Sequence, residues 1–253
     1  MKTKNVLIII GIIAAVLYGG LSPVVAGGND QKPPGKHKFP PPKPTKPPKP
    51  VVKPKPKPQP TLYSGRAVAV NLSNVVNGAV WYLADTGPLR HCGGLVDVTI
   101  GATNIDTLSV GGAHVVTSGV GGVADSRAEV QDFSAVFVHG DITNTIAFTS
   151  VSAEARAECT ATGVVLSASS QVQGLTIDGT NVLVTGEANQ VITIDAGNIV
   201  LNAQLGSQAT NCQKGEVTVA AIFLMLSNSF NGPIGYAEAD IRCGTRLPAS
   251  GES

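Results

Sequence analysis

The chain has 253 residues and a formal net charge of only +1, yet its charges are divided unevenly along the sequence. Nine lysines and one acid lie in residues 27–60, whereas residues 61–253 hold seven basic and sixteen acidic side chains. A division of this size indicates two parts with different physical roles. The four cysteines lie too far apart for a CxxC redox centre or for the paired-ligand spacing of structural zinc, so both classes are excluded.

Residues 1–26 have the layout of a secretory signal peptide. Lys2 and Lys4 form a short basic region, an apolar run follows from Val6 to Leu17, and Ala26 occupies the position before the expected cleavage site. An uncleaved anchor helix is the alternative, because the apolar stretch is only just long enough to span a bilayer. We expect cleavage, no membrane span afterwards, and a location outside the cell or on the surface of a bacterial envelope.

Residues 27–60 contain thirteen of the seventeen prolines, interleaved with lysine. Proline fixes φ and removes a backbone donor, so this linker is expected to be a disordered polyproline-II stalk that reaches on the order of 100 Å. It could be a spacer, or a cationic tether that grips an anionic cell-wall polymer or the envelope surface. Nucleic acid is not an expected partner, because Phe39 is the only aromatic residue available for stacking in this segment.

Residues 61–245 are expected to form one all-β domain, followed by a disordered tail at 246–253. Small apolar residues alternate with polar ones in Val151–Cys159 and again in Ala237–Cys243, which predicts two half-buried strands that each end in an inward cysteine. Asp178-Gly179 and Ala196-Gly197-Asn198 predict hairpin turns. The apolar run Val217–Leu226 predicts a strand covered on both faces, with a short buried helix as the alternative. The expected fold is therefore a disulfide-stapled antiparallel β-sandwich.

Four cysteines outside the cytoplasm are expected to form disulfides, and they allow three connectivities. The matching strands favour Cys159–Cys243, which leaves Cys92–Cys212. Because the inward side chains of those strands are small, we expect a thin core in which the disulfides carry much of the stability.

Several short segments occur in a recognisable order. A strand at Ser64–Val70 is followed by the alanine-rich strand ending at Cys159, by Gly174–Gly179, by Ile199–Gln204 and by a closing strand ending at Cys243. Over roughly residues 64–243 this order resembles the bacterial choice-of-anchor P proteins. The resemblance implies export and some form of surface attachment, but it implies no biochemical activity.

No catalytic residue, metal site or cofactor is predicted, since the sequence has no G-x-S-x-G, no H-E-x-x-H and no P-loop. His139 with Asp141 and His91 beside Cys92 are possible metal ligands, and so are Asp178 and Asp195 for calcium, but solvated turn residues explain them better.

Trp81 and Tyr82 are the weak ligand-binding candidates. Together they could form a sugar-stacking platform, although a core anchor is the favoured interpretation.

The leading hypothesis is a non-enzymatic structural or adhesive protein. The alternatives are a secreted carbohydrate-binding module, which would use Trp81 and Tyr82, and a hydrolase of unrecognised type with a carboxylate pair among the sixteen acids.

Overall fold

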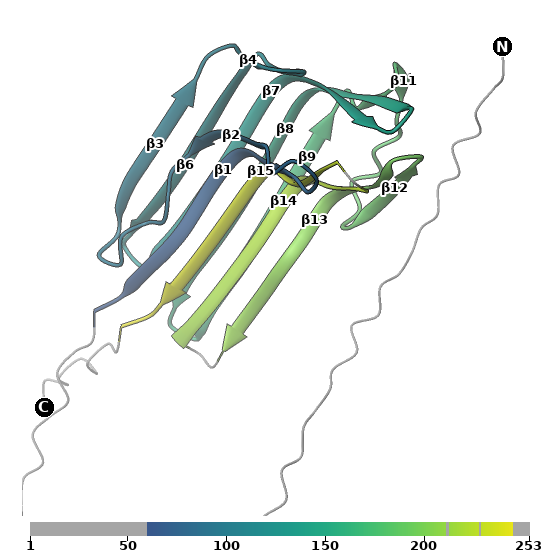
Figure 1. Cartoon of the computed structure of the whole chain (residues 1–253). Helices are drawn as coiled ribbons and strands as arrows, with labels where there is room; N and C mark the ends of the chain where they lie inside the picture. The colour runs from purple at the N-terminus through teal and green to yellow at the C-terminus, as the bar shows by residue number, and fades with distance from the viewer. Residues whose placement is uncertain (1–59, 211–212, 228, 245–253) are drawn as a thin grey trace, which may run out of the picture. The chain divides into compact units, whose positions relative to one another are not determined.

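A computed structural model describes residues 60–210, 213–227 and 229–244 (Figure 1). The expected signal peptide, nearly all of the Lys/Pro stalk and the expected C-terminal tail lie outside these residues. Within them the strands pair antiparallel in two sheets that pack face to face, which confirms the predicted all-β sandwich.

One layer is a six-stranded sheet with the order β12-β13-β14-β15-β1-β2. The bounds of its strands are β1 Leu62–Asn74, β2 Val80–Asp85, β12 Gln190–Ile194, β13 Gly197–Thr210, β14 Lys214–Leu226 and β15 Phe230–Arg242.

The other layer is a nine-stranded sheet built around the long hairpin of β7 and β8. One half of this hairpin is flanked by β6 and β9, and the other half by β5 and β10. The bounds of its strands are β3 Gly94–Ile100, β4 Thr103–Ile105, β5 Leu108–Val110, β6 Gly112–Val120, β7 Val123–His139, β8 Ile142–Thr160, β9 Gly163–Gln173, β10 Thr176–Ile177 and β11 Thr180–Asn181.

Most of the sequence-based strand predictions are confirmed. The alternating segments lie in β8 and β15, and their small apolar residues point into the core. Asp178-Gly179 forms the β10–β11 turn, and Gly197 begins β13 directly after the β12–β13 turn. Val217–Leu226 is a strand, as expected, but Met225 is 42% exposed, so the run is not covered on both faces along its whole length.

The reason is a crease that crosses the six-stranded sheet through Ala84, Ala69, Gly235, Ala221 and Asn202, one residue from each of five strands. The pairing register skips these residues, as where Val68 pairs with Tyr236 and Val70 with Ile234.

In every second strand the skipped residue has a left-handed backbone, with φ of 42° at Ala84, 64° at Gly235 and 51° at Asn202. The inward alternation therefore shifts by one residue at the crease, and the strands on both sides of it keep their apolar side chains in the core.

A second crease crosses the nine-stranded sheet at Asp132, Thr149 and Gly174. Gln131 pairs with Ser150 and Phe133 with Phe148, while Asp132 and Gly174 have φ of 50° and 65°. The two creases face each other, because a Cβ added to Gly235 would lie 3.3 Å from the Cγ2 of Val151.

The creases divide the core into two zones. On the side where β8 and β15 end, the fully buried residues are mainly small, and we call this the alanine zone; it includes Ala67, Ala128, Ala153, Ala155, Ala157, Ala237 and Ala239. On the other side lies an aromatic zone with Trp81, Phe133, Phe137, Phe148 and Phe230. The predicted thin core is therefore correct for one zone and wrong for the other.

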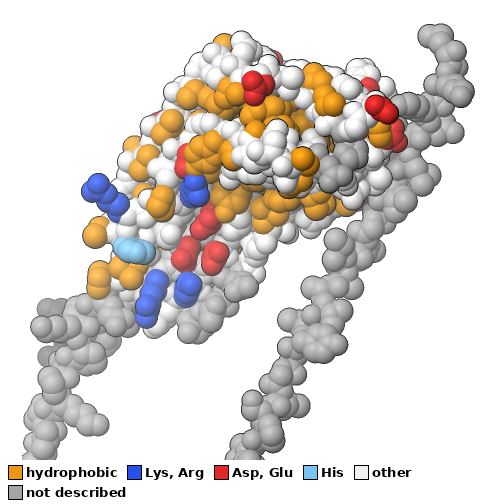
Figure 2. All heavy atoms as spheres, viewed as in Figure 1, with side chains coloured by type: hydrophobic (Ala, Val, Ile, Leu, Met, Phe, Trp, Pro, Cys, Tyr) orange, Lys and Arg blue, Asp and Glu red, His pale blue; other side chains and the backbone are white. Residues whose placement is uncertain are grey.

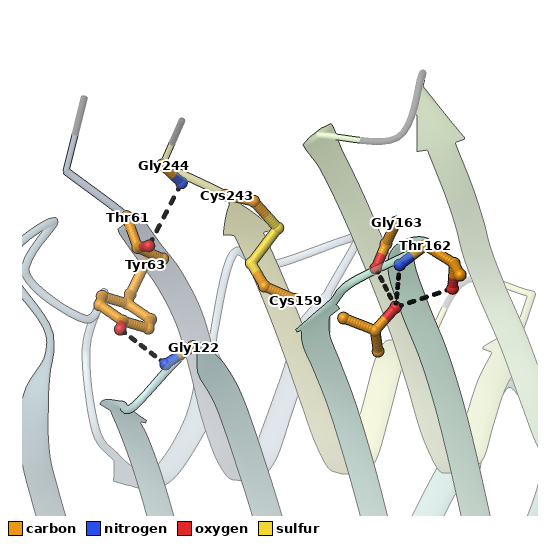
Figure 3. The surroundings of a disulfide bond; sticks show 9 residues. Thr61, Tyr63, Gly122, Cys159, Thr162, Gly163, Cys243 and Gly244 are labelled. Atoms are coloured by element: carbon orange, nitrogen blue, oxygen red, sulfur yellow. Dashed lines mark hydrogen bonds between the residues drawn. A yellow bond between two sulfur atoms is a disulfide. The ribbon is translucent and has the colours of Figure 1, made fainter. Parts of the chain in front are cut away.

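The predicted Cys159–Cys243 disulfide is present and lies at the end of the alanine zone, with a Cα–Cα distance of 5.7 Å (Figure 3). It joins the end of β8 in one sheet to the residue after β15 in the other. Beside it, the Tyr63 hydroxyl accepts a 3.0 Å hydrogen bond from the Gly122 backbone N–H. The disulfide therefore fastens the two sheets together where the side chains between them are smallest.

Among the described residues Cys92 is exposed and has no disulfide partner; its predicted partner Cys212 lies outside them, so the Cys92–Cys212 pairing stays a prediction. Cys92 is positioned beside β1, because the preceding residue His91 accepts a hydrogen bond from the backbone N–H of Tyr63.

Candidate functional site

Trp81 is a core residue and not part of an exposed platform. Its side chain is 3% exposed, stacks on Phe230 with ring centroids 3.9 Å apart, and lies tilted against Phe137 at 5.7 Å. Because neighbouring residues of a strand point to opposite faces, Trp81 points into the sandwich and Tyr82 points out. The prediction that both rings could stack on one sugar is therefore wrong, and the core-anchor interpretation of Trp81 is confirmed.

Tyr82 remains on the surface, 42% exposed, in a polar cluster with Arg66 and Asp85. The Arg66 guanidinium donates two hydrogen bonds to the Asp85 carboxylate, at 2.9 and 2.7 Å, and lies 6.0 Å from the Tyr82 ring centroid. The Tyr82 hydroxyl donates to the same carboxylate, and so does the Gly87 backbone N–H, at 2.8 Å. These contacts tie β2 to β1 on the outer face of the six-stranded sheet.

The protonation states in this cluster follow from its contacts. Burial alone would raise the pKa of Asp85, but the hydrogen bonds from Arg66, Tyr82 and Gly87 outweigh it and hold that pKa below its ordinary value. Burial and the bond to Asp85 raise the pKa of Tyr82. At neutral pH the cluster is an ion pair with a neutral phenol, and the Asp85 carboxylate is engaged by donors on two strands and a turn. Such an arrangement suits a structural clasp better than a general base.

The same outer face carries further charges of both signs. Figure 2 shows acidic side chains grouped near the middle of this face, with basic ones around them. Glu238 is the cross-strand partner of Arg66 and accepts a 2.7 Å hydrogen bond from the Tyr236 hydroxyl, while Asp240 pairs with Glu216. The pKa of Asp240 is raised, mainly by burial. The charge of Lys214 lowers this pKa in part, and repulsion from Glu238 raises it further.

The residues considered as metal ligands lie at separate turns, except that His139 and Asp141 share one. The Asp178 carboxylate accepts hydrogen bonds from the Thr145 backbone N–H at 2.8 Å and the Asn144 amide at 2.9 Å, so it shapes the β10–β11 turn. His114, which lies on β6, pairs with Asp97 on β3 at 2.9 Å. His139 and Asp141 lie at the β7–β8 turn, and Asp195 lies at the β12–β13 turn. The part of the chain that the structure describes holds no group of three or more His, Cys, Asp or Glu side chains suited to a metal ion.

A cavity of about 260 Å³ lies where β9 passes over β13 and β14. Its walls include Leu166, Ser167 and Ala168 from β9 and Gln204, Gly206 and Ser207 from β13. β13 has a bulge there, between Gln204 and Gly206. The lining has no carboxylate, histidine or thiol, so it offers none of the carboxylate pair that the hydrolase hypothesis requires.

Sequence reasoning missed this cavity. The only signal was compositional, since β9 and the second half of β13, two of the segments that line it, lack charged residues and proline. Cross-strand register, which decides where the cavity forms, cannot be read from one strand alone.

Comparisons of the chain with models of known protein families, with curated proteins and with solved structures give no match. The resemblance to choice-of-anchor P proteins therefore stays a prediction. Within the described residues there is no helix of the length and hydrophobicity that crossing a bilayer requires.

Proposed function

We propose that this protein is exported and serves a non-enzymatic structural or adhesive role at the bacterial cell surface, with its β-sandwich held away from the envelope by the Lys/Pro segment. The observation that carries the proposal is the Cys159–Cys243 disulfide. Disulfides form and persist outside the reducing cytoplasm. This one also fastens the two sheets in the zone where the core is thinnest, so an oxidising location would directly support the fold.

The unequal charge distribution adds to the proposal. Nine lysines precede a domain of net negative charge, so the segment and the domain interact differently with an anionic envelope. Electrostatics would attract the segment and repel the domain, which favours a sandwich that faces outwards.

Cell fractionation tests this function and separates the two roles of the Lys/Pro segment. The full chain and a variant lacking residues 27–60 are produced in a bacterium, and the cytosol, envelope and medium are analysed, with thiol labelling of each pool. We expect the full chain in the envelope fraction with Cys159 and Cys243 oxidised. Release of the deletion variant into the medium would identify the segment as a tether, and its retention would identify a spacer.

Two results would refute the proposal. One is a full chain that stays in the cytosol with its amino-terminal residues intact and its cysteines reduced. The other is a protein that is free in the medium and has no affinity for cells or isolated walls.

The carbohydrate-binding alternative now rests on Tyr82, whose ring is exposed while Arg66 lies near it. A glycan array probed with the wild type and with Tyr82→Ala tests it directly. Absence of binding by the wild type would remove this alternative without affecting the surface role.

A further inference from the structure

Strand β9 has an unprotected edge. Among the described residues it pairs only with β8, in a continuous register from Gly163 to Gln173, so the N–H and C=O groups of its other edge have no strand partner. Proteins usually protect such edges with charge, proline or a bulge. β9 contains none of these, whereas β3, at the opposite side of the sheet, carries the exposed Asp97 paired with His114.

Strand β13, in the other sheet, has a free edge on the same side of the sandwich. β12 pairs with it only as far as Leu201. Beyond that, the Asn189 backbone N–H donates to the Asn202 carbonyl at 3.1 Å, and the Gln204 backbone N–H donates to the Asn189 side chain at 3.0 Å. Residues 205–210 have no partner on that side among the described strands. This stretch contains no charged residue and no proline; the bulge between Gln204 and Gly206 is its one protecting feature, and it lies at the start of the open edge.

The inner face of β13 is uncovered at the same place. Gln204 and Ser207 pair with Val219 and Val217, which point into the core and are buried, yet Gln204 and Ser207 themselves are exposed. The nine-stranded sheet ends at β9 and does not extend over them. The free edge of β9 and the uncovered face of β13 thus border a slot, and the cavity of about 260 Å³ lies in it.

The directions of the strands indicate what fits this slot. β8 and β15 end together at the disulfide, β9 runs antiparallel to β8, and β13 runs in the same direction as β15. β9 and β13 are therefore antiparallel. Consider two copies related by a two-fold axis parallel to the strands. β13 of the first copy would then lie beside β9 of the second copy. It would also cover the exposed inner face of β13 in the second copy.

The heights of the two segments also match. Ser170 of β9 donates a 3.0 Å hydrogen bond to Asn202, and a Cβ on Gly215, the pairing partner of Ala209, would lie 2.6 Å from Val164. Residues 164–170 are thus level with residues 202–209. Rotation about an axis parallel to the strands preserves height, so the open part of β13, residues 205–210, would lie opposite the first half of β9 in the other copy.

We propose that this slot is a homodimer interface, in which the free edge of β9 in each copy pairs with residues 205–210 of the other. Both segments are uncharged, so they bring no like charges together although the domain as a whole is acidic. The contact is isologous and closes after two copies. It goes beyond the proposed surface role and does not depend on it.

The size of the contact sets the expected affinity. Six residues span about 20 Å, and two packed sheets with side chains are about 20 Å thick, so about 800 Å² would be buried in total. This is below the size of most specific interfaces, so we expect a weak dimer with a dissociation constant on the order of 100 micromolar.

Sedimentation equilibrium of the purified, oxidised protein, from micromolar to several hundred micromolar, measures the association. Ser207→Lys puts a charged side chain into the slot and leaves a solvent-exposed residue in the monomer, so it should weaken dimerisation about tenfold or more. Thr99→Lys, on the exposed face of β3, is the matched control and should leave dimerisation unchanged. A monomer at every concentration, or equal dimerisation of both variants, would overturn the proposal.

Disulfide trapping tests the geometry of the pairing in a background with Cys92→Ser and Cys212→Ser. Leu166→Cys and Ser207→Cys, which lie at the same height, should form a cross-linked dimer when the two variants are mixed, and neither should do so alone. A cross-linked dimer of Leu166→Cys alone would mean that β9 pairs with β9, and it would overturn the proposed arrangement.

Discussion

Removal of the Cys159–Cys243 disulfide should cost this domain a large part of its stability. The bond closes a loop with a sequence separation of 84 residues. In the chain-entropy treatment, ΔS is −2.1 − 1.5R ln n, which gives about 4.5 kcal/mol at 25 °C for a loop of this length. Since domains of this kind are stable by about 5–15 kcal/mol, the double variant Cys159→Ala/Cys243→Ala should lie close to the limit of folding.

The alanine zone makes compensation difficult. Ala153, Ala155 and Ala157 on β8 face Ala237 and Ala239 on β15, all fully buried, and they bury little apolar area per residue. The region that loses the covalent link is thus the region with the least hydrophobic burial in reserve.

Urea titration followed by far-UV circular dichroism measures the effect. The comparison includes the oxidised wild type, the double variant, the wild type with a reductant, and Cys92→Ser as a control that should shift the free energy of unfolding by less than about 0.5 kcal/mol. If the double variant lost less than about 1 kcal/mol, the loop-closure reasoning would be refuted, because the unfolded chain would gain little freedom from losing the bond.

Three further predictions concern the crease and the charged outer face. Gly235→Ala should lower the free energy of unfolding by roughly 2–4 kcal/mol, from a left-handed backbone and crowding. Its new Cβ would lie 3.2 Å from a neighbouring side chain, whereas Gly101→Ala, with no atom within 4 Å, should change little in the same urea titration. The pKa of Asp85 is lowered, so its contribution is present at neutral pH and is lost as the pH falls below about 4; Asp85→Asn should destabilise at pH 7 and have little effect near pH 2. The pKa of Asp240 is raised, so its ionised form is unfavourable in the folded state, and Asp240→Asn should stabilise at pH 7 and converge with the wild type in acid. Urea midpoints across this pH range check both signs, and equal shifts for the two variants would contradict the assignment.

The strands were predictable where a strict alternation lies on one side of a crease. Val151–Cys159 and Ala237–Cys243 are such segments, and their small inward residues also identified the correct disulfide. The turn at Asp178-Gly179 was readable because Asp and Gly tolerate positive φ.

The creases themselves were not predictable. Ala84 has a φ of 42°, a conformation for which alanine has no preference, so no local signal marks it. The same shift explains the apolar run Val217–Leu226, in which the buried residues change face near Ala221 and produce the appearance of a strand covered on both sides. Tertiary packing determines the backbone conformation at these positions. The crease can therefore be recognised only when the pairing of several strands is known.

The candidate sites were less predictable than the fold. Of the aromatic pair, the alternation of β2 buries Trp81 and exposes Tyr82, and this follows once the strand is placed. Arg66 and Asp85 were missed because their contact depends on the pairing of β1 with β2. The slot beside β9 requires knowledge of where each sheet ends, which no single segment encodes.

The arrangement of the chain ends has a mechanical consequence. The Gly244 backbone N–H donates a 3.2 Å hydrogen bond to the Thr61 hydroxyl, so the polypeptide enters and leaves the sandwich at one end. A pull on residue 60 against the opposite end would load the ladder of β1 and β15, which extends from Leu62 to Asn74, in shear. A pull on residue 60 against residue 244 would instead separate β1 from β15 one residue pair at a time. In that geometry the Cys159–Cys243 disulfide, which links the end of β15 to β8, would keep β15 in the sheet.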